Sequence, residues 1–180
     1  MFSRPDGLWE VDAHLADVKT HDVRMAEGIR RAGTPIHELT LRLVVDAQLN
    51  ILEAGSESAW VPYDGYCGEH GDAYQALVGL NLGQSFRRAV AERLGGARGC
   101  THLTELAHVL PSAVIQAFAG SVIDTHGLEP GAEKPFQIDR CHALKSQGEV
   151  VRVHYPRWYR QPGAKNSAHN PPASPDPPTS

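Results

Sequence analysis

The chain has 180 residues, a net charge of −4 and 41% hydrophobic residues, which is the composition of an ordinary globular protein. Phosphate contacts require clustered Lys and Arg, so a slightly acidic chain predicts no nucleic-acid partner. Three cysteines are too few for a disulfide framework, and no apolar stretch is long enough to cross a bilayer. We therefore expect a cytoplasmic protein that has no membrane partner and carries no secretory signal.

The last twenty residues, 161–180, differ in composition from the rest of the chain. They contain six of the 13 prolines, and Ser, Asn and Gly make up much of the remainder. Such a segment has too little apolar surface to offset the entropy lost on ordering. The sequence predicts a disordered proline-rich tail over 161–180 and a single folded domain over 6–160.

The first third of the chain has the two-residue periodicity of β-strands. Apolar and polar residues alternate over 8–15 and again over 39–44, and the segment 46–48 can turn the chain into a returning strand over 49–54. Asp12, His14 and Asp17 are expected along the first strand, where residues 10, 12 and 14 share one face. Such a face could bind a polar ligand or a metal, but the solvated face of an antiparallel sheet is the favoured interpretation. The pattern predicts an antiparallel meander.

The middle third has helical periodicity. We expect a short helix after Asp72, a second helix over 85–94 that ends at Gly95 and Gly96, and a third over 101–118. Pro111 is expected to kink the third helix or split it. A last strand is expected over 149–153. The predicted fold class is α+β, in which an N-terminal antiparallel sheet packs against a C-terminal helical layer with a late strand.

The common signatures of nucleotide hydrolysis, hydride transfer and α/β-hydrolase chemistry are absent, but Cys and His residues recur at the ends of predicted elements. Cys100 falls at the N-terminus of the third helix, where the helix dipole favours the thiolate form, and His102 lies two residues further on. Cys67 lies in a glycine-rich bend. The pairs His37–Glu38 and Cys141–His142 also lie beside turns.

Cysteine and histidine are the ligands that zinc and iron centres prefer, so these residues predict a metal site. We expect His37, Cys67 and Cys100 to bind zinc, iron or an iron–sulfur cluster, with Glu38, His102 or Cys141 completing the ligand set. One alternative is a metal-independent thiol enzyme in which Cys100 is the nucleophile and His102 or His37 is the base. The other is a non-catalytic interaction domain whose cysteines only fill space. The sequence leaves open whether the chain is an enzyme, and it identifies no small-molecule or protein partner.

Six segments of the chain carry a resemblance to known sequences. The most specific is Gly99-Cys100-Thr101-His102-Leu103-Thr104-Glu105-Leu106; the others lie at 7–17, 35–43, 77–80, 141–144 and 155–157. Together they resemble a bacterial family known only as domain of unknown function 2889. The resemblance covers most of 6–160 and implies no particular activity.

The order of the elements also resembles the U-type iron–sulfur scaffold fold. That resemblance implies a ligand before a strand hairpin, a cysteine after it and a cysteine at the head of a later helix. Cys67 and Cys100 match the last two positions, and His37 or Glu38 stands in place of the first cysteine. Cys141 has no counterpart in the scaffold.

Overall fold

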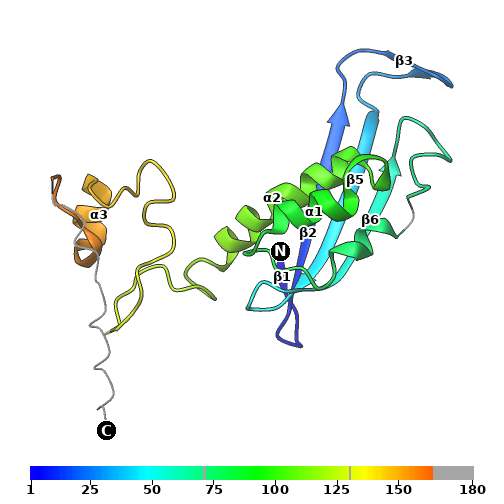
Figure 1. Cartoon of the computed structure of the whole chain (residues 1–180). Coiled ribbons are helices and arrows are strands. Elements are labelled where there is room, and N and C mark those ends of the chain that lie inside the picture. The colour runs from blue at the N-terminus through cyan, green and yellow to red at the C-terminus, as the bar shows by residue number, and fades with distance from the viewer. Residues whose placement is uncertain (71, 130, 164–180) are drawn as a thin grey trace, which may run out of the picture. The chain divides into compact units, whose positions relative to one another are not determined.

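The computed structural model of the chain describes residues 1–70, 72–129 and 131–163. It divides into two compact units, Met1–Ile123 and Asp124–Ser180 (Figure 1). The single domain expected over 6–160 stays a prediction, and nearly all of the expected tail lies outside the described residues, which end at 163.

The first unit is built on a four-stranded antiparallel sheet. Its spatial order is β1 (Phe2–Ser3), β2 (Trp9–Val18), β5 (Pro35–Val45) and β6 (Ile51–Trp60). A separate hairpin, β3 (Val23–Met25) with β4 (Gly28–Arg30), interrupts the chain between β2 and β5 and extends beyond the end of the sheet in Figure 1. The antiparallel sheet expected from the two-residue periodicity is thus confirmed.

The tight connection between β5 and β6 explains their register. The carboxylate of Asp46 accepts hydrogen bonds from the backbone N–H groups of Gln48 and Asn50, at 2.9 and 2.8 Å. The side-chain amide of Asn50 also donates to this carboxylate, at 2.9 Å. Because a one-residue slip would turn every side chain to the wrong face, this turn helps to direct Leu41 and Leu43 into the core.

Two α-helices cover one face of the sheet, α1 (Phe86–Leu94) and α2 (Thr101–Phe118), with short 3₁₀ turns at η1 (Ala73–Leu77) and η2 (Gly96–Arg98) (Figure 1). Asp72 precedes η1 as expected, but its side chain makes no capping hydrogen bond. α2 runs through Pro111 without being split into two helices. No helix among the described residues is long and apolar enough to cross a membrane.

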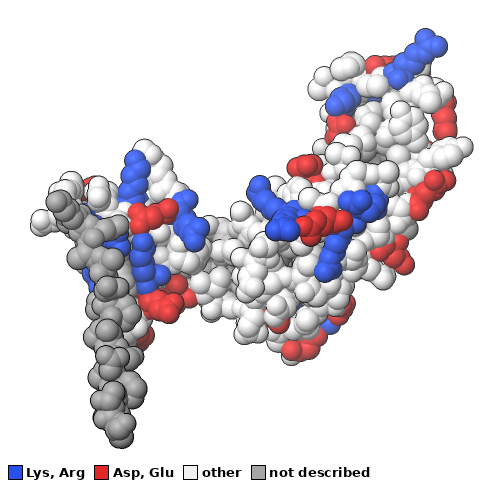
Figure 2. Space-filling view, viewed as in Figure 1, with Lys and Arg blue, Asp and Glu red and all other residues white. Residues whose placement is uncertain are grey.

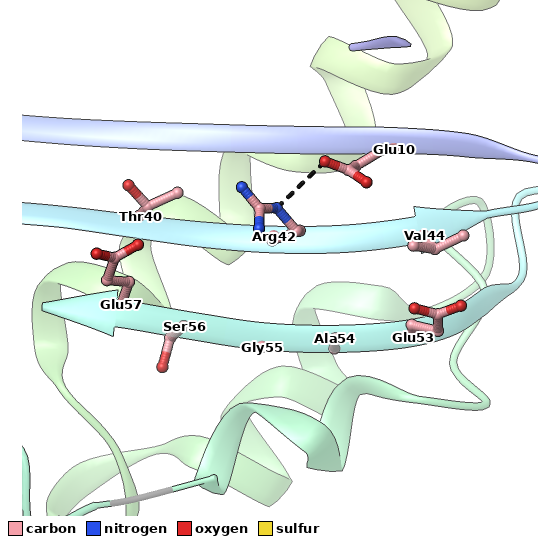
Figure 3. Close-up of a pocket in the computed structure, with 9 residues that line it drawn as sticks. All are labelled: Glu10, Thr40, Arg42, Val44, Glu53, Ala54, Gly55, Ser56 and Glu57. Carbon is pink, nitrogen blue, oxygen red and sulfur yellow. Dashed lines mark ion pairs between the residues drawn. The ribbon is translucent and has the colours of Figure 1, made fainter. Parts of the chain in front are cut away.

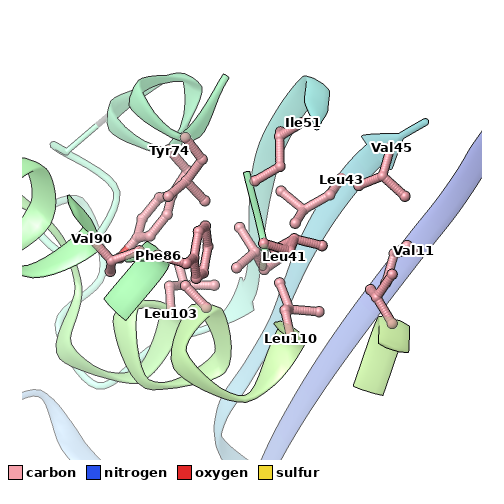
Figure 4. Close-up of a cluster of buried hydrophobic side chains, with 14 of the residues drawn as sticks. Val11, Leu41, Leu43, Val45, Ile51, Tyr74, Phe86, Val90, Leu103 and Leu110 are labelled. Carbon is pink, nitrogen blue, oxygen red and sulfur yellow. The ribbon is translucent and has the colours of Figure 1, made fainter. Parts of the chain in front are cut away.

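The core lies between the sheet and the helices (Figure 4). Leu39, Leu41, Leu43 and Val45 point inward from β5 at every second residue. They are buried, because β5 has a neighbouring strand on each side and the helices cover this face. The helices contribute buried residues at three- and four-residue spacing, including Phe86, Val90 and Leu94 of α1, and Leu103, Ala107, Leu110 and Val114 of α2. Two periodicities in the sequence thus meet in one apolar layer.

The second unit differs from the expectation. Residues Glu149–His154 form helix α3, followed by the 3₁₀ turn η3 (Pro156–Trp158), so the late strand expected over 149–153 is wrong. Only Val151 of this segment is buried, and Glu149 pairs with Arg152 one turn later along α3. Although Val is enriched in strands, no described strand lies in this unit to pair with it, so the local preference does not decide the structure.

Candidate functional site

The start of β5 and the start of α2 meet at a small pocket that holds four of the residues singled out in the sequence. His37 points inward from β5, whereas Cys100 occupies the N-cap position of α2 without a side-chain capping hydrogen bond, and His102 lies in the first turn of that helix. Cys67 comes from the loop that follows β6, where its backbone N–H donates to the carbonyl of Tyr63 at 3.0 Å. The pocket measures about 210 Å³ and is lined by His37, Leu39, Ser58, Val61, Pro62, Tyr63, Cys67, Cys100, Thr101 and His102.

Three polar side chains of this pocket and one beside it form a row of successive contacts in space. The Sγ atom of Cys100 lies 3.9 Å from Nδ1 of His102. The ring of His102 lies against the ring of His37, with centroids 4.1 Å apart and planes tilted by 42°. Nδ1 of His37 lies 3.2 Å from Oδ2 of Asp17, whose other oxygen accepts a hydrogen bond from Lys19 at 2.6 Å. The result is a row running from carboxylate through two imidazoles to a thiol.

Asp17 is the member of this row that the sequence analysis placed on the first strand but did not connect with His37. It is paired with His37 in the register of β2 and β5, and both side chains point to the inner face of the sheet. The signal that could have found it was strand pairing, because residues directly opposite each other on one face have side chains in reach.

The charges in the row are set by burial and by neighbours. Burial lowers the pKa of His102, and the nearby His37 lowers it further, while Asp17 acts in the opposite direction. The hydrogen bonds from Lys19 and then from His37 lower the pKa of Asp17. At neutral pH His102 is therefore an uncharged imidazole beside Cys100, and Asp17 is a carboxylate beside His37.

The backbone at Cys100 is held by a fully buried tyrosine. The hydroxyl of Tyr74 donates to the carbonyl of Cys100 at 2.7 Å and lies 3.1 Å from the hydroxyl of Thr104. A Cβ atom at Gly99 would stand only 3.1 Å from the Tyr74 hydroxyl and 3.2 Å from the carbonyl oxygen of Leu94. Glycine before Cys100 thus permits the close approach by which Tyr74 fixes the start of α2.

A second pocket borders the two thiols. It measures about 440 Å³, and its lining is Tyr66, Cys67, Glu69, His70, Ala97, Gly99 and Cys100. Cys67 and Cys100 are both half-buried and line both pockets. Both cysteines therefore lie at the boundary between two pockets.

The remaining two candidates lie elsewhere. Glu38 follows His37 on β5 and so points to the outer face of the sheet, where its Oε1 is 3.9 Å from Nε2 of His14. Cys141 is exposed, belongs to the second unit and does not line the pocket. Within the part of the chain that the structure describes, no three Cys, His, Asp or Glu side chains stand ready to hold one metal ion.

The outer face of the sheet has a hollow of its own, about 330 Å³ in volume, that is floored by β5 and β6 (Figure 3). Arg42 stands at its centre and is already paired with Asp12 at 2.7 Å and with Glu10 at 3.3 Å. Gly55 is paired with Arg42 across β5 and β6, and the space beside it is open, since a Cβ atom at Gly55 would meet nothing within 4 Å. No thiol or imidazole lines this hollow, whereas two thiols and two imidazoles line the pocket on the inner face.

Basic side chains gather over α1 (Figure 2). Arg88 pairs with Glu92 at 2.8 Å, Arg93 donates to the carbonyl of Ala76 at 2.6 Å, and Arg98 donates to the carbonyl of Ala91 at 3.2 Å. These contacts stabilise the helical layer and supply no phosphate-binding loop.

Fold and site together define an α+β domain of two layers, with a thiol–imidazole pocket between the sheet and the head of α2. The chain belongs to a family described as protein of unknown function (DUF2889), whose model matches residues 1–116. The match covers most of the first unit and includes His37, Cys67, Cys100 and His102. No curated protein and no solved structure matches the chain.

Proposed function

We propose that the pocket between β5 and α2 binds a thiophilic divalent cation, zinc being the best fit, through Cys67, Cys100, His37 and His102. The observation that carries the proposal is that four soft donors from separate parts of the chain line one pocket of about 210 Å³. Two sulfurs and two imidazoles are a common zinc ligand set. A single nucleophile with its base would account for only two of the four.

Two further observations support this assignment. Zinc requires neutral imidazole, and the lowered pKa of His102 keeps that ring uncharged at neutral pH. A histidine that binds metal through one nitrogen usually holds a carboxylate with the other, and Asp17 contacts Nδ1 of His37 at 3.2 Å. Nε2 of His37 is then the nitrogen left for the metal.

Loading the site requires side chains to move. Cys100 and His102 lie side by side at 3.9 Å, which suits two ligands of one ion, but no third donor among the described residues joins them at binding distance. We infer that Cys100 and His102 bind first, and that Cys67 and His37 rotate toward the ion. The ligand set closes without an open position, which favours a structural or carrier role over Lewis-acid catalysis.

Cobalt(II) titration of the metal-free full chain tests the proposal. Cobalt bound to thiolate in a tetrahedral site gives an intense ligand-to-metal charge-transfer band and d–d bands. One equivalent of zinc should bleach both, because zinc displaces the cobalt. Cys67→Ser and Cys100→Ser should weaken the charge-transfer band, and His102→Gln should lower the affinity at least tenfold.

Two variants serve as matched controls. Glu38→Gln lies one residue from His37 but on the other face, and Cys141→Ser removes a thiol of the second unit, so both should bind cobalt as the wild type does. A folded wild-type chain that shows no thiolate-to-cobalt band contradicts the proposal. If anaerobically purified protein shows iron–sulfur absorption, the group bound at these residues is an iron–sulfur cluster, and the assignment of zinc is wrong.

One contact favours a second candidate, metal-independent thiol chemistry at Cys100. The 3.9 Å contact between the Cys100 sulfur and Nδ1 of His102 places an imidazole where it can serve as the base for a thiol nucleophile. This candidate predicts that iodoacetamide alkylates Cys100 in the metal-free chain much faster than Cys141, although Cys141 is more exposed. His102→Gln should abolish that difference. Equal or slower labelling of Cys100 would leave no support for it.

A further inference from the structure

Two of the three cysteines line the same two pockets, although they come from different parts of the chain. Cys67 lies in the loop after β6, and Cys100 lies at the N-cap of α2. Both are half-buried, and both line the pocket of about 210 Å³ and the neighbouring pocket of about 440 Å³. Cys141 lines neither pocket. The boundary between the two pockets therefore brings two thiols together.

The backbones of these two cysteines are held in different ways. The carbonyl of Cys100 accepts a hydrogen bond from the buried hydroxyl of Tyr74 at 2.7 Å, which fixes it at the start of α2. The N–H of Cys67 donates to Tyr63 in its own loop. Among the described residues, the backbone hydrogen bonds of 63–69 stay within that segment. Cys67 can therefore move toward Cys100 without breaking any such bond to the sheet or to a helix.

The loop that carries Cys67 also has space for this movement. Gly65 and Gly68 flank Cys67, and a Cβ atom at either glycine would meet nothing within 4 Å. A disulfide requires the two Cα atoms to lie within about 7 Å of each other. Because Cys100 is fixed, the approach is made by the loop.

We propose that Cys67 and Cys100 form a dithiol that a peroxide oxidises to a disulfide. Cys100 reacts with the peroxide, because Nδ1 of His102 lies 3.9 Å from its sulfur and is placed to serve as the base. Cys67 is the resolving cysteine, and a reactive cysteine with a second thiol beside it is the usual arrangement of a reversible redox site. The pocket of about 440 Å³ gives the peroxide room beside both residues.

The reaction balances with hydrogen peroxide as the only oxidant. The thiolate of Cys100 attacks one peroxide oxygen, the O–O bond breaks, and the departing hydroxide takes up the thiol proton to become water. Cys100 is then a sulfenic acid. The thiolate of Cys67 attacks the sulfenic sulfur, the S–S bond forms, and a second hydroxide leaves and is protonated by the second thiol proton. The two thiols lose two electrons and two protons, and the peroxide is reduced to two waters.

Disulfide formation also controls the zinc site, and this consequence rests on the proposed function. The bond consumes the two thiolates that bind zinc, so oxidation releases the ion, and bound zinc in turn protects both sulfurs from peroxide. The dithiol itself does not depend on the metal, because its reaction needs only two sulfurs and an oxidant.

Peptide mapping of the full chain tests the disulfide directly. The metal-free chain is treated with hydrogen peroxide, its remaining thiols are alkylated, and it is digested without reduction. Trypsin separates the three cysteines, because it cleaves after Arg98 and Arg140. We expect a linked pair of peptides that carry Cys67 and Cys100, from a chain that stays monomeric on a non-reducing gel. A link to Cys141 in its place, or no link at all, overturns the proposal.

Variants test the role of each side chain, with circular dichroism as the check of folding. Cys67→Ser removes the resolving thiol, so dimedone should trap a sulfenic acid at Cys100. In Cys100→Ser, dimedone should label Cys67 no faster than Cys141. His102→Gln should slow disulfide formation about tenfold. His108→Gln is the matched control on α2, since His108 lines neither pocket, and it should have no such effect. Faster labelling at Cys67 than at Cys100, or equal rates in the two histidine variants, overturns the proposed roles.

Oxidation in the presence of zinc distinguishes this inference from the proposed function. One equivalent of zinc should slow disulfide formation in the wild type. If zinc gives no protection although the metal-free chain forms the disulfide, the metal site is wrong and the dithiol stands. If cobalt binds but the metal-free chain forms no disulfide, the dithiol is wrong and the metal site stands.

Discussion

Tyr74 offers a sharp test of how the candidate site is built. Tyr74→Phe keeps the buried ring and opens no cavity, so the change removes only the hydroxyl and its contacts with the Cys100 carbonyl at 2.7 Å and the Thr104 hydroxyl at 3.1 Å. The Cys100 carbonyl still accepts from the N–H of Thr104 at 2.9 Å, so it is not left without a partner.

The size of the effect follows from these contacts. A net hydrogen bond contributes about 1 kcal/mol, and the buried hydroxyl carries a desolvation cost that its removal relieves. We expect the free energy of unfolding to fall by about 1.5 kcal/mol, which corresponds to roughly 5 °C in Tm for a unit of this size. Because the start of α2 loosens, cobalt affinity should fall as well, although no donor atom is changed.

Urea unfolding and cobalt titration measure the two effects, and Tyr66→Phe is the matched control, since Tyr66 is 71% exposed. Tyr66→Phe should change the free energy of unfolding by less than about 0.5 kcal/mol. If Tyr74→Phe is no more destabilising than Tyr66→Phe, the buried hydroxyl does not hold the start of α2, and our account of how Cys100 is positioned is wrong.

Three further predictions concern separate parts of the chain. Gly95→Ala would place a Cβ atom 2.4 Å from the carbonyl oxygen of Ala91, so it should cost about 2 kcal/mol in urea unfolding, whereas Gly68→Ala meets nothing within 4 Å and should be near neutral. Because the pKa of His102 is lowered in the folded chain, this imidazole binds a proton more tightly in the unfolded chain. The free energy of unfolding should therefore fall as the pH drops below about 6.5. His102→Gln should reduce this dependence when unfolding is measured between about pH 5 and pH 8. Hydrogen bonds from Lys134 and Ser146 hold the pKa of Asp139 well below its usual range, so the carboxylate contributes to stability above about pH 3.8 and loses this contribution in more acid solution. Asp139→Asn should speed hydrogen exchange in the second unit and leave the first unit unchanged.

Local patterns in the sequence predicted the longer elements of the first unit, whereas β1 and the β3–β4 hairpin were not anticipated. The alternation in β2 and β5 and the three- and four-residue spacing in α2 reflect which face of each element is buried, so they can be seen without the fold. Gly95 likewise marks the end of α1, because its Cβ-free backbone packs against the carbonyl of Ala91.

The same reasoning failed at 149–153 and was incomplete at the site. Val150, Val151 and Val153 favour a strand locally, but a strand needs a neighbour, and none is described in the second unit. Glu38 was grouped with His37 because they are adjacent in sequence, yet adjacent residues on a strand point to opposite faces. Asp17 was not connected to His37, because the pairing of β2 with β5 spans an inserted hairpin.

The amino-acid sequence by itself determined the order and type of the longer elements of the first unit and marked His37, Cys67, Cys100 and His102 as residues of chemical interest. Only the tertiary structure decided that these four line one pocket, that Asp17 contacts His37 and that Glu38 faces away. The reason is physical: periodicity reports burial within one element, whereas a site depends on strand register and on how a helix lies across the sheet, which are set by contacts between residues far apart in the chain.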